Sequence, residues 1–326
     1  MDAWIICSIC LLALQMQACN GQNLSFLVVG DWGGMPWAPY TTFVEQACAK
    51  QMSLKAEEYK TEFTLALGDN FYFDGVTSVD DKRFKETFED IFTSKDLYKP
   101  WFVLAGNHDH RGNVSAQIQY TKYSSRWKFP DYYYNFTVKV PQTSTVVEIV
   151  MIDTVVLCGG SDDFAGSQPQ GPEDDLSAQT QWQWIERTLS SSRADFLLVA
   201  GHYPVYSIAE HGPTKCLIKQ LLPLLQKYNV TAYLSGHDHN LQHLQTESSG
   251  KEMNFFVIGS GNFIENSKIH LHDVPVNSSK FFFAEYAALG GFSAVHVTSS
   301  VITFQIIDGV GNQVYKYQLP PRKIIS

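Results

Sequence analysis

Five short apolar runs in this sequence each end in a glycine that is followed by a side chain able to bind a metal ion. The runs are "VVGD" with Asp31, "ALGD" with Asp69, "LAGNH" with Asn107 and His108, "VAGH" with His202, and "LSGHDH" with His237 and His239. Each residue alone is more often a turn, cap or hydrogen-bonded structural residue. Together they concentrate more polarity than a structural role explains, and a metal centre would satisfy it.

The residue types also indicate which metals fit. No thiolate lies near any of the motifs, which argues against a structural zinc or iron–sulfur site. Carboxylate, amide and imidazole ligands suit Fe, Mn and Zn. Two such ions that share one carboxylate form the usual clamp for attack on phosphorus. Tyr72, three residues after Asp69, adds a candidate phenolate, a hard ligand matched to Fe³⁺.

The motifs can meet only if strands and helices alternate around them. Between the apolar runs, helical patterns occur at 43–59, 82–92, 114–127 and 214–228. This alternation predicts β-α-β units and a largely parallel, buried sheet. After Gly236 strand-like runs dominate, and two runs in mid-chain indicate a hairpin. We expect one domain of two packed sheets with helices outside, whose strand ends bring the motifs together.

The composition limits the class of partner. The chain has 326 residues, of which 44% are hydrophobic and 17% charged, so it can bury a substantial core. Its formal net charge is −9 and it has no basic block, which argues against nucleic acid or an anionic membrane as the main partner. A small anionic substrate would then need a local positive site, such as a metal.

The N-terminus predicts export. Residues 4–14, "WIICSICLLAL", form an apolar run of signal-peptide length that is too short for an ordinary membrane span. We expect a signal peptide over 1–21 and a single domain over 22–326. The alternative is a buried N-terminal helix, since Asp2 makes the n-region weak. No other stretch is long and apolar enough to span a bilayer.

Three cysteines, Cys48, Cys158 and Cys216, lie beyond the predicted signal. In an oxidising compartment they suggest one bridge and one spare thiol, and these residues alone leave the pair open. Residues 159–175 are acidic, rich in Gly, Pro and Ser, and without periodicity. They predict a long loop that is either a solvated surface excursion or a regulatory segment.

N-x-S/T sequons occur at Asn23, Asn113, Asn135, Asn229 and Asn277. Asn229 directly precedes an apolar strand, which disfavours its modification. In a secretory protein we expect glycosylation at Asn113 and Asn135 in particular.

With these blocks in hand, the sequence resembles the purple acid phosphatases, most closely their small mammalian-type, tartrate-resistant members. The resemblance is carried by "GDWGG", "GDNFYFDGV", "GNHDH", "VAGHYPV", "AEHGPT" and "GHDHNLQ", and it covers nearly the whole chain after the predicted signal. "GDNFY" separates it from the Ser/Thr protein phosphatase branch, which lacks the tyrosine ligand. The resemblance implies an α/β, four-layer sandwich of two mixed β-sheets flanked by α-helices, with one metallophosphatase catalytic domain over 22–326.

The resemblance also implies roles for the motif residues. The ferric ligands correspond to Asp31, Tyr72 and His239. The ligands of a divalent ion, which would be Fe²⁺, Zn²⁺ or Mn²⁺, correspond to Asn107, His202 and His237. Asp69 would bridge the two ions, and His108 and His211 would lie beside the substrate phosphate as catalytic groups.

Further implications concern the cysteines and the loop. Cys158 and Cys216 match the family's disulfide, and 159–175 matches its exposed loop, whose cleavage relieves inhibition in mammalian-type members. The sequence departs from the family at Cys48, which has no expected counterpart. No Lys or Arg lies between Cys158 and Arg187, so cleavage of the loop by a trypsin-like protease is disfavoured.

These features predict a monomeric acid phosphatase of the secretory pathway, lysosomal or extracellular, acting on small phosphomonoesters or phosphoproteins. Fe³⁺ would lower the pKa of its bound water, so that a hydroxide persists in acid and attacks phosphorus. His211, with His108 as the second candidate, would protonate the leaving group, which favours an acid optimum. The alternatives are a secreted iron-carrying or redox glycoprotein with incidental hydrolysis, and a metallophosphodiesterase or nuclease.

Overall fold

The described part of the chain in this computed structural model comprises residues 23–162, 164–248 and 250–324. The expected signal peptide, 1–21, lies outside it. Among the described residues, no helix has the length and apolar character that crossing a membrane requires.

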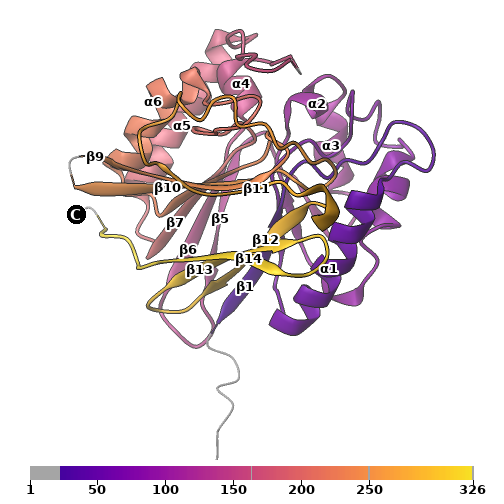
Figure 1. Cartoon of the computed structure of the whole chain (residues 1–326), viewed down its shortest axis with the longest axis horizontal. Helices are drawn as coiled ribbons and strands as arrows, with labels where there is room; N and C mark the ends of the chain where they lie inside the picture. Colours follow the sequence, from indigo (N-terminus) through magenta and orange to yellow (C-terminus); the bar gives the residue numbers. More distant parts are fainter. Residues whose placement is uncertain (1–22, 163, 249, 325–326) are drawn as a thin grey trace, which may run out of the picture.

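Two seven-stranded sheets form the centre of the molecule (Figure 1). The first has the order β14 (Gln313–Leu319), β13 (Ile302–Asp308), β12 (Gly291–Val297), β1 (Leu24–Val29), β2 (Thr64–Ala66), β3 (Trp101–Val103) and β4 (Trp127–Lys128). The second has the order β11 (Ser279–Phe283), β9 (Leu241–Ser248), β10 (Lys251–Ile258), β8 (Ala232–Ser235), β7 (Phe196–Ala200), β6 (Val146–Met151) and β5 (Tyr134–Lys139).

Both sheets are mixed. β1 to β4 are parallel to one another, as are β6, β7, β8 and β10. The remaining pairs are antiparallel, including the mid-chain hairpin of β5 and β6. The C-terminal strand β12 pairs antiparallel with β1, in a register that places Leu24 opposite Val297. The first sheet is therefore built from both ends of the described chain.

Helices cover the outer faces of the sheets and complete four layers. They are α1 (Phe43–Tyr59), α2 (Asn107–His110), α3 (Val114–Tyr120), α4 (Thr154–Cys158), α5 (Asp175–Ser191) and α6 (Lys215–Lys227), with a π-helical turn at Phe84–Glu89 and 3-10 turns at Lys95–Leu97 and Tyr286–Ala288. Figure 1 shows α1, α2 and α3 on one side of the sheets and α5 and α6 on the other.

The alternation of buried side chains along the strands explains this layering. Phe26 and Leu65 of the first sheet and Leu198 of the second belong to one buried cluster between the sheets. The neighbouring Leu27 points to the opposite face and packs in the cluster that includes Met52 of α1. Successive residues of a strand face opposite sides, so a strand with two apolar faces has to be covered twice.

The sequence predictions are correct for the two-sheet sandwich, for the helix at 43–59 and for the mid-chain hairpin. Two predictions of helix extent are wrong, and one helix was missed. The helical pattern over 114–127 ends at Tyr120, because Trp127 joins the sheet beside Trp101. Only Phe84–Glu89 of 82–92 is helical, and α5 was not predicted.

Candidate metal centre

The five predicted motifs meet at the carboxyl ends of strands from both sheets. Asp31, Asp69 and Asn107 follow β1, β2 and β3 of the first sheet, and His202 and His237 follow β7 and β8 of the second. The site therefore lies where the ends of the two sheets face each other. This position explains how residues so far apart in sequence become neighbours.

The glycines before the ligands allow the backbone to approach the carboxylates. A Cβ placed on Gly106 would lie 2.1 Å from Asp69 Oδ1, and one on Gly236 would lie 2.2 Å from Asp31 Oδ2. Any larger residue at these positions would displace the carboxylates. Asp31 and Asp69 themselves have left-handed backbone conformations, with φ angles of 57° and 50°. Such a conformation costs a residue other than glycine about 1–3 kcal/mol and occurs most often at functional sites.

One group of donor atoms converges around Asp31. The Tyr72 hydroxyl oxygen lies 3.1 Å from Asp31 Oδ1 and 3.0 Å from His239 Nε2, and the third side of this triangle measures 3.7 Å. Ligand atoms bound about 2.0–2.2 Å from one ion stand about 3 Å apart. The three residues thus have the spacing that a shared ion requires.

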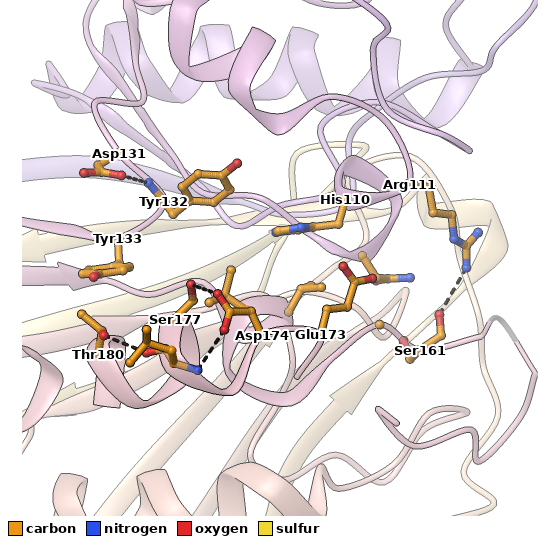
Figure 2. A pocket seen from close by; sticks show the side chains of 15 residues that line it. His110, Arg111, Asp131, Tyr132, Tyr133, Ser161, Glu173, Asp174, Ser177 and Thr180 are labelled. Carbon is orange, nitrogen blue, oxygen red and sulfur yellow. Dashed lines mark hydrogen bonds between the residues drawn. The ribbon is translucent and has the colours of Figure 1, made fainter. Parts of the chain in front are cut away.

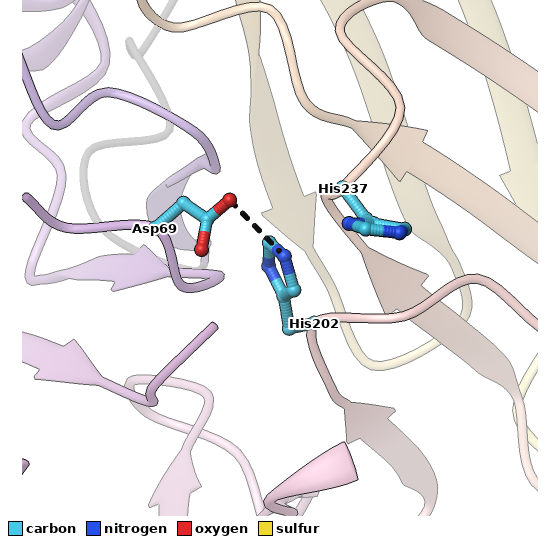
Figure 3. Close-up of side chains that lie close together, drawn as sticks. All are labelled: Asp69, His202 and His237. Atoms are coloured by element: carbon cyan, nitrogen blue, oxygen red, sulfur yellow. Dashed lines mark ion pairs between the residues drawn. The ribbon is translucent and has the colours of Figure 1, made fainter. Parts of the chain in front are cut away.

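A second group surrounds His202. The ring Nδ1 of His202 donates to the Leu67 carbonyl at 2.9 Å, so Nε2 is left as the acceptor that a metal needs. This Nε2 lies 2.9 Å from Asn107 Oδ1 and 3.3 Å from Asp69 Oδ2. One ligand atom each from Asp69, His202 and His237 fits within 4.8 Å (Figure 3). Asp69 belongs to this group and lies next to the first.

The charges of the buried groups are perturbed in a way that a cation would relieve. Burial raises the pKa of Asp31 well above its ordinary value, against the opposing effect of His202. Burial acts in the same direction on Asp69, but the His202 and His108 imidazoles outweigh it and hold the pKa of this carboxyl below its ordinary value. A bound cation stabilises both carboxylates and the deprotonated hydroxyl of Tyr72, whose pKa is raised first by burial and then by Asp31.

Burial and neighbouring charges also shift the pKa values of the imidazoles. Burial disfavours the charged form of His202, yet Asp69 raises its pKa to about 9. Burial lowers the pKa of His239 to about 3 and that of His237 well below its ordinary value. Neutral His237 and His239 are in the protonation state that metal binding uses, and His202 would release its Nε2 proton to water when a metal binds.

His108 and His211 lie beside these two groups. His108 Nδ1 donates to the Phe73 carbonyl at 2.6 Å, and its Nε2 lies 3.9 Å from Asp69 Oδ2. The His211 ring stacks on that of His237, with centroids 4.1 Å apart. The side chain of His211 is 9% exposed, and its Nδ1 has no hydrogen-bond partner among the described residues.

Residues that sequence reasoning left without a role hold these loops in place. Arg83 donates to the backbone carbonyls of Gly33 and Tyr72, which fixes the backbone that presents the hydroxyl of Tyr72. Asp109 accepts hydrogen bonds from the backbone of Gly106 at 2.8 Å and of Asn70 at 3.1 Å. The signal for Asp109 was present in "GNHDH", whereas nothing in the sequence around Arg83 marks its role.

The segment 159–175 is attached close to the site. Cys158 and Cys216 form a disulfide with an S–S distance of 2.09 Å. Backbone hydrogen bonds from Gly171 to Cys158 and from Gln170 to Gly160 close a neck at its base. Gly166 donates to the backbone of Glu210, next to His211. The loop is therefore fastened to the segment that carries His211.

The structure also places Cys48 and the asparagines of three sequons. Cys48 is a free, buried thiol whose Sγ lies 3.6 Å from the Leu289 carbonyl. Asn113 and Asn135 are exposed. The amide of Asn229 donates to the Lys323 carbonyl at 3.0 Å.

Comparison with known proteins finds phosphatases among the relatives of this chain. The sequence profile of the calcineurin-like phosphoesterase family matches residues 24–241. Tartrate-resistant acid phosphatase type 5 from Homo sapiens is 50% identical over 325 residues, covering 99% of both chains. Purple acid phosphatase 4 from Arabidopsis thaliana is 32% identical, covering 90% of this chain and 83% of its own.

Among solved structures, the Plasmodium protein GAP50, described as the anchor in the inner membrane complex, has a TM-score of 0.76 at 25% identity. The similarity covers 93% of this chain and 90% of GAP50. The purple acid phosphatase PPD1 from yellow lupin seeds has a TM-score of 0.62 at 15% identity, covering 92% of this chain and 54% of that one.

Proposed function

Since this chain belongs to the purple acid phosphatase family and is an acid phosphatase, we propose that it hydrolyses phosphomonoesters at a binuclear Fe(III)–M(II) centre. The observation that carries the proposal is the pair of donor groups around Asp31 and His202, with Asp69 between them. Asp69 could serve two ions only in such an arrangement.

In this proposal the ferric ion is held by Asp31, Tyr72 and His239. The divalent ion, Fe²⁺ or else Zn²⁺ or Mn²⁺, is held by Asn107, His202 and His237. Asp69 is shared. When bound, the ions supply Lewis acidity toward the phosphate and a nucleophile from water that persists in acid.

The protein's own part is to position the ester and to supply a proton. His211 Nδ1 is the favoured proton donor, because it has no other partner among the described residues and sits beside His237. His108 keeps its Nδ1 proton on the Phe73 carbonyl, so its Nε2 can donate to a phosphate oxygen when the ring is protonated. Protonated imidazole is abundant only in acid, so this assignment predicts an acid optimum.

The second candidate is an iron-carrying or redox glycoprotein with incidental hydrolysis. GAP50 has a similar fold and is described as an anchor, so the fold alone does not decide between these functions. The placement of His108 and His211 beside the donor groups favours the enzyme, because iron storage requires no proton donor.

We also propose that the protein acts in the secretory pathway, as a lysosomal or extracellular monomer with a signal peptide over 1–21. The Cys158–Cys216 bridge supports an oxidising compartment, and exposed Asn113 and Asn135 offer glycosylation sites. A single catalytic domain over 22–326 follows from the same reasoning, since β12 to β14 complete the first sheet.

The test combines metal analysis with turnover. The purified protein should contain two metal ions per chain, at least one of them iron, and should hydrolyse p-nitrophenyl phosphate fastest in acid. Removal of the metals by a chelator should abolish turnover, and addition of Fe together with a divalent ion should restore it. Iron-loaded protein without turnover on any phosphomonoester would favour the carrier function instead.

A further inference from the structure

A cavity of about 780 Å³ is lined in part by Asn107, one of the proposed metal ligands. Figure 2 shows side chains that line this cavity. Its walls come from α2, from the turn before β5, from α4 and from the start of α5. The volume lies within the range of about 300–1,000 Å³ typical of ligand sites. Because Asn107 borders it, a phosphoester at the centre can extend its alcohol portion into this space.

Two buried polar atoms at the wall lack partners. Asn107 is 2% exposed and Ser161 is 5% exposed, and both line the cavity. Within the described segments, neither Asn107 Nδ2 nor Ser161 Oγ has a hydrogen-bond partner. Buried polar groups are normally hydrogen-bonded, so each is a donor available to a ligand in the cavity. They point to a polar substrate rather than to a purely apolar one.

The basic side chains that line the cavity interact with protein groups, whereas its carboxylates are exposed. Arg111 donates to the Ser161 carbonyl at 3.2 Å. His110 pairs with Asp153 at 2.7 Å. Arg111 and His110 are thus both engaged by protein groups, and against the effect of burial Asp153, together with Glu173, raises the pKa of His110.

The carboxylates are Asp131, Glu173 and Asp174, which are exposed and line the cavity; all three are labelled in Figure 2. Beside them stand the half-buried rings of Tyr132 and Tyr133. Carboxylates attract a cation, and aromatic faces add cation–π attraction within about 6 Å. The part of the cavity that faces solvent therefore favours positive charge.

From this we infer that the cavity is a leaving-group subsite for phosphorylated peptide side chains that are flanked by lysine or arginine. The inference rests on the proposed function, since it places the phosphate at the metal centre. Asn107 Nδ2 and Ser161 Oγ donate to peptide carbonyls or phosphate oxygens near the centre. Asp131 and Glu173 pair with the cationic flanks farther out. The subsite selects among phosphomonoesters by the charge beside the phosphate.

The experiment compares two short peptides with a central phosphoserine, one flanked by lysines and the other by norleucines, which keep the stem and lack the ammonium. The metal-loaded protein should hydrolyse the lysine peptide with a kcat/KM about three- to tenfold higher, because exposed ion pairs are modest in strength. The difference should lie in KM, since the contact exists in both ground and transition states. Added salt should reduce the ratio.

A variant series locates the preference. In the double variant Asp131→Asn, Glu173→Gln the ratio of the two kcat/KM values should fall to about one. The ratio is internal to each variant, so a change in overall activity does not affect it. Glu57→Gln, which neutralises an exposed carboxylate on α1 away from the cavity, should keep the wild-type ratio.

Equal kcat/KM values for the two peptides in the wild-type protein would overturn the inference. So would a lysine preference that survives intact in the double variant, because the selecting charges would then lie elsewhere. An absence of turnover on p-nitrophenyl phosphate as well as on both peptides would overturn the proposed function, and the subsite with it.

Discussion

Asp69 is the residue on which both proposed ions depend. Asp69→Asn removes the negative charge between two adjacent cations, and we expect loss of metal and a fall in turnover of at least about 100-fold, since even the outer partners of metal ligands affect affinity or activity 10–100-fold. Metal analysis and a phosphatase assay measure both effects. Asp74→Asn, an exposed carboxylate in the same loop, is the matched control and should keep two metals. A variant at Asp69 with two metals and near-normal turnover would refute the bridge.

Tyr72 provides a spectroscopic prediction. A phenolate bound to Fe³⁺ donates charge to the metal and gives a visible absorption band, so Tyr72→Phe should abolish the band while the ring stays in place. The hydrolytic centre should partly survive, because Asp31 and His239 still reach the same position. Tyr203→Phe, a buried tyrosine whose hydroxyl donates to the Gly159 carbonyl, should retain the band. Persistence of the band in Tyr72→Phe would remove Tyr72 from the ligand set.

At the scale of single residues, the sequence marks the proposed ligands Asp31, Asp69, Asn107, His202 and His237 because each follows a strand and a glycine. It does not predict the residues that hold them. The guanidinium of Arg83 reaches Tyr72 and Gly33 across 11 and 50 positions of sequence, a distance set by the fold. The unpartnered atoms of Asn107 and Ser161 are likewise visible only when their surroundings are known.

The loop 159–175 supports a prediction at the scale of elements. Its neck is closed by backbone hydrogen bonds from Gly171 and Gln170, so 162–169 can be removed with Gly160 and Ser161 retained. We expect the deletion to raise kcat with unchanged metal content, because the removed part is fastened beside His211 rather than built into the centre. Steady-state kinetics and metal analysis are the measurements. A folded deletion with unchanged or lower kcat would contradict a repressive role for the segment.

The deletion stops before Asp174 because this residue caps α5. A longer excision through Asp175 would remove Asp174, whose carboxylate accepts from the backbone of Leu176 at 2.9 Å and caps the helix. Loss of such a cap costs about 0.5–2 kcal/mol, which would confuse an effect on kinetics with one on stability.

Helices were predictable where local signals and packing agree. α1 begins after Thr42, whose hydroxyl accepts from the Glu45 backbone at 3.1 Å, and ends at Tyr59, before Lys60 in the left-handed conformation. The pattern after Val114 continues to Trp127 in the sequence, but strand pairing overrides it in the fold. α5 follows directly on an irregular acidic segment, which obscured its buried stripe of Ala178 and Ile185.

At the scale of the molecule, His243 links stability to pH. It lies in β9, where Nδ1 accepts from the Tyr315 hydroxyl at 2.8 Å and Nε2 donates to Asn254 at 3.0 Å. Burial lowers its pKa to about 4, below the value of about 6.5 in an unfolded chain. The unfolded state then binds the proton more tightly. The stabilisation is complete above about pH 6.5 and is lost as the pH falls toward about 4.

His243→Gln should therefore reduce the loss of unfolding free energy between about pH 7 and about pH 4.5 by about 2 kcal/mol. Urea unfolding at the two pH values measures this loss. The variant should be less stable than the wild type at neutral pH, since its contacts differ. His272→Gln, at an exposed histidine, should leave the loss unchanged. Equal losses in wild type and His243→Gln would show that His243 does not titrate in this range.

The order of the strands could be predicted only in part. Alternating apolar and helical stretches predict β1, β2 and β3 as parallel neighbours and β7 and β8 as a parallel pair, because such units are local. The run of strands after Gly236 indicated two packed sheets, and the resemblance to a family implied the four-layer sandwich. No local sequence pattern predicts that β12 pairs with β1, since this pairing joins residues from opposite ends of the described chain.

That return has a consequence for the newborn chain. During synthesis β1 emerges early, yet its antiparallel neighbour is not translated until Val297. For most of the time on the ribosome, Leu24–Val29 therefore has one unpaired, strongly apolar edge, the kind of edge on which chains associate wrongly. A nascent polypeptide stalled before Gly291 should bind chaperones that capture apolar segments, and one released after Leu319 should not. β1 therefore gains its antiparallel neighbour only when β12, one of the last strands to be synthesised, has emerged.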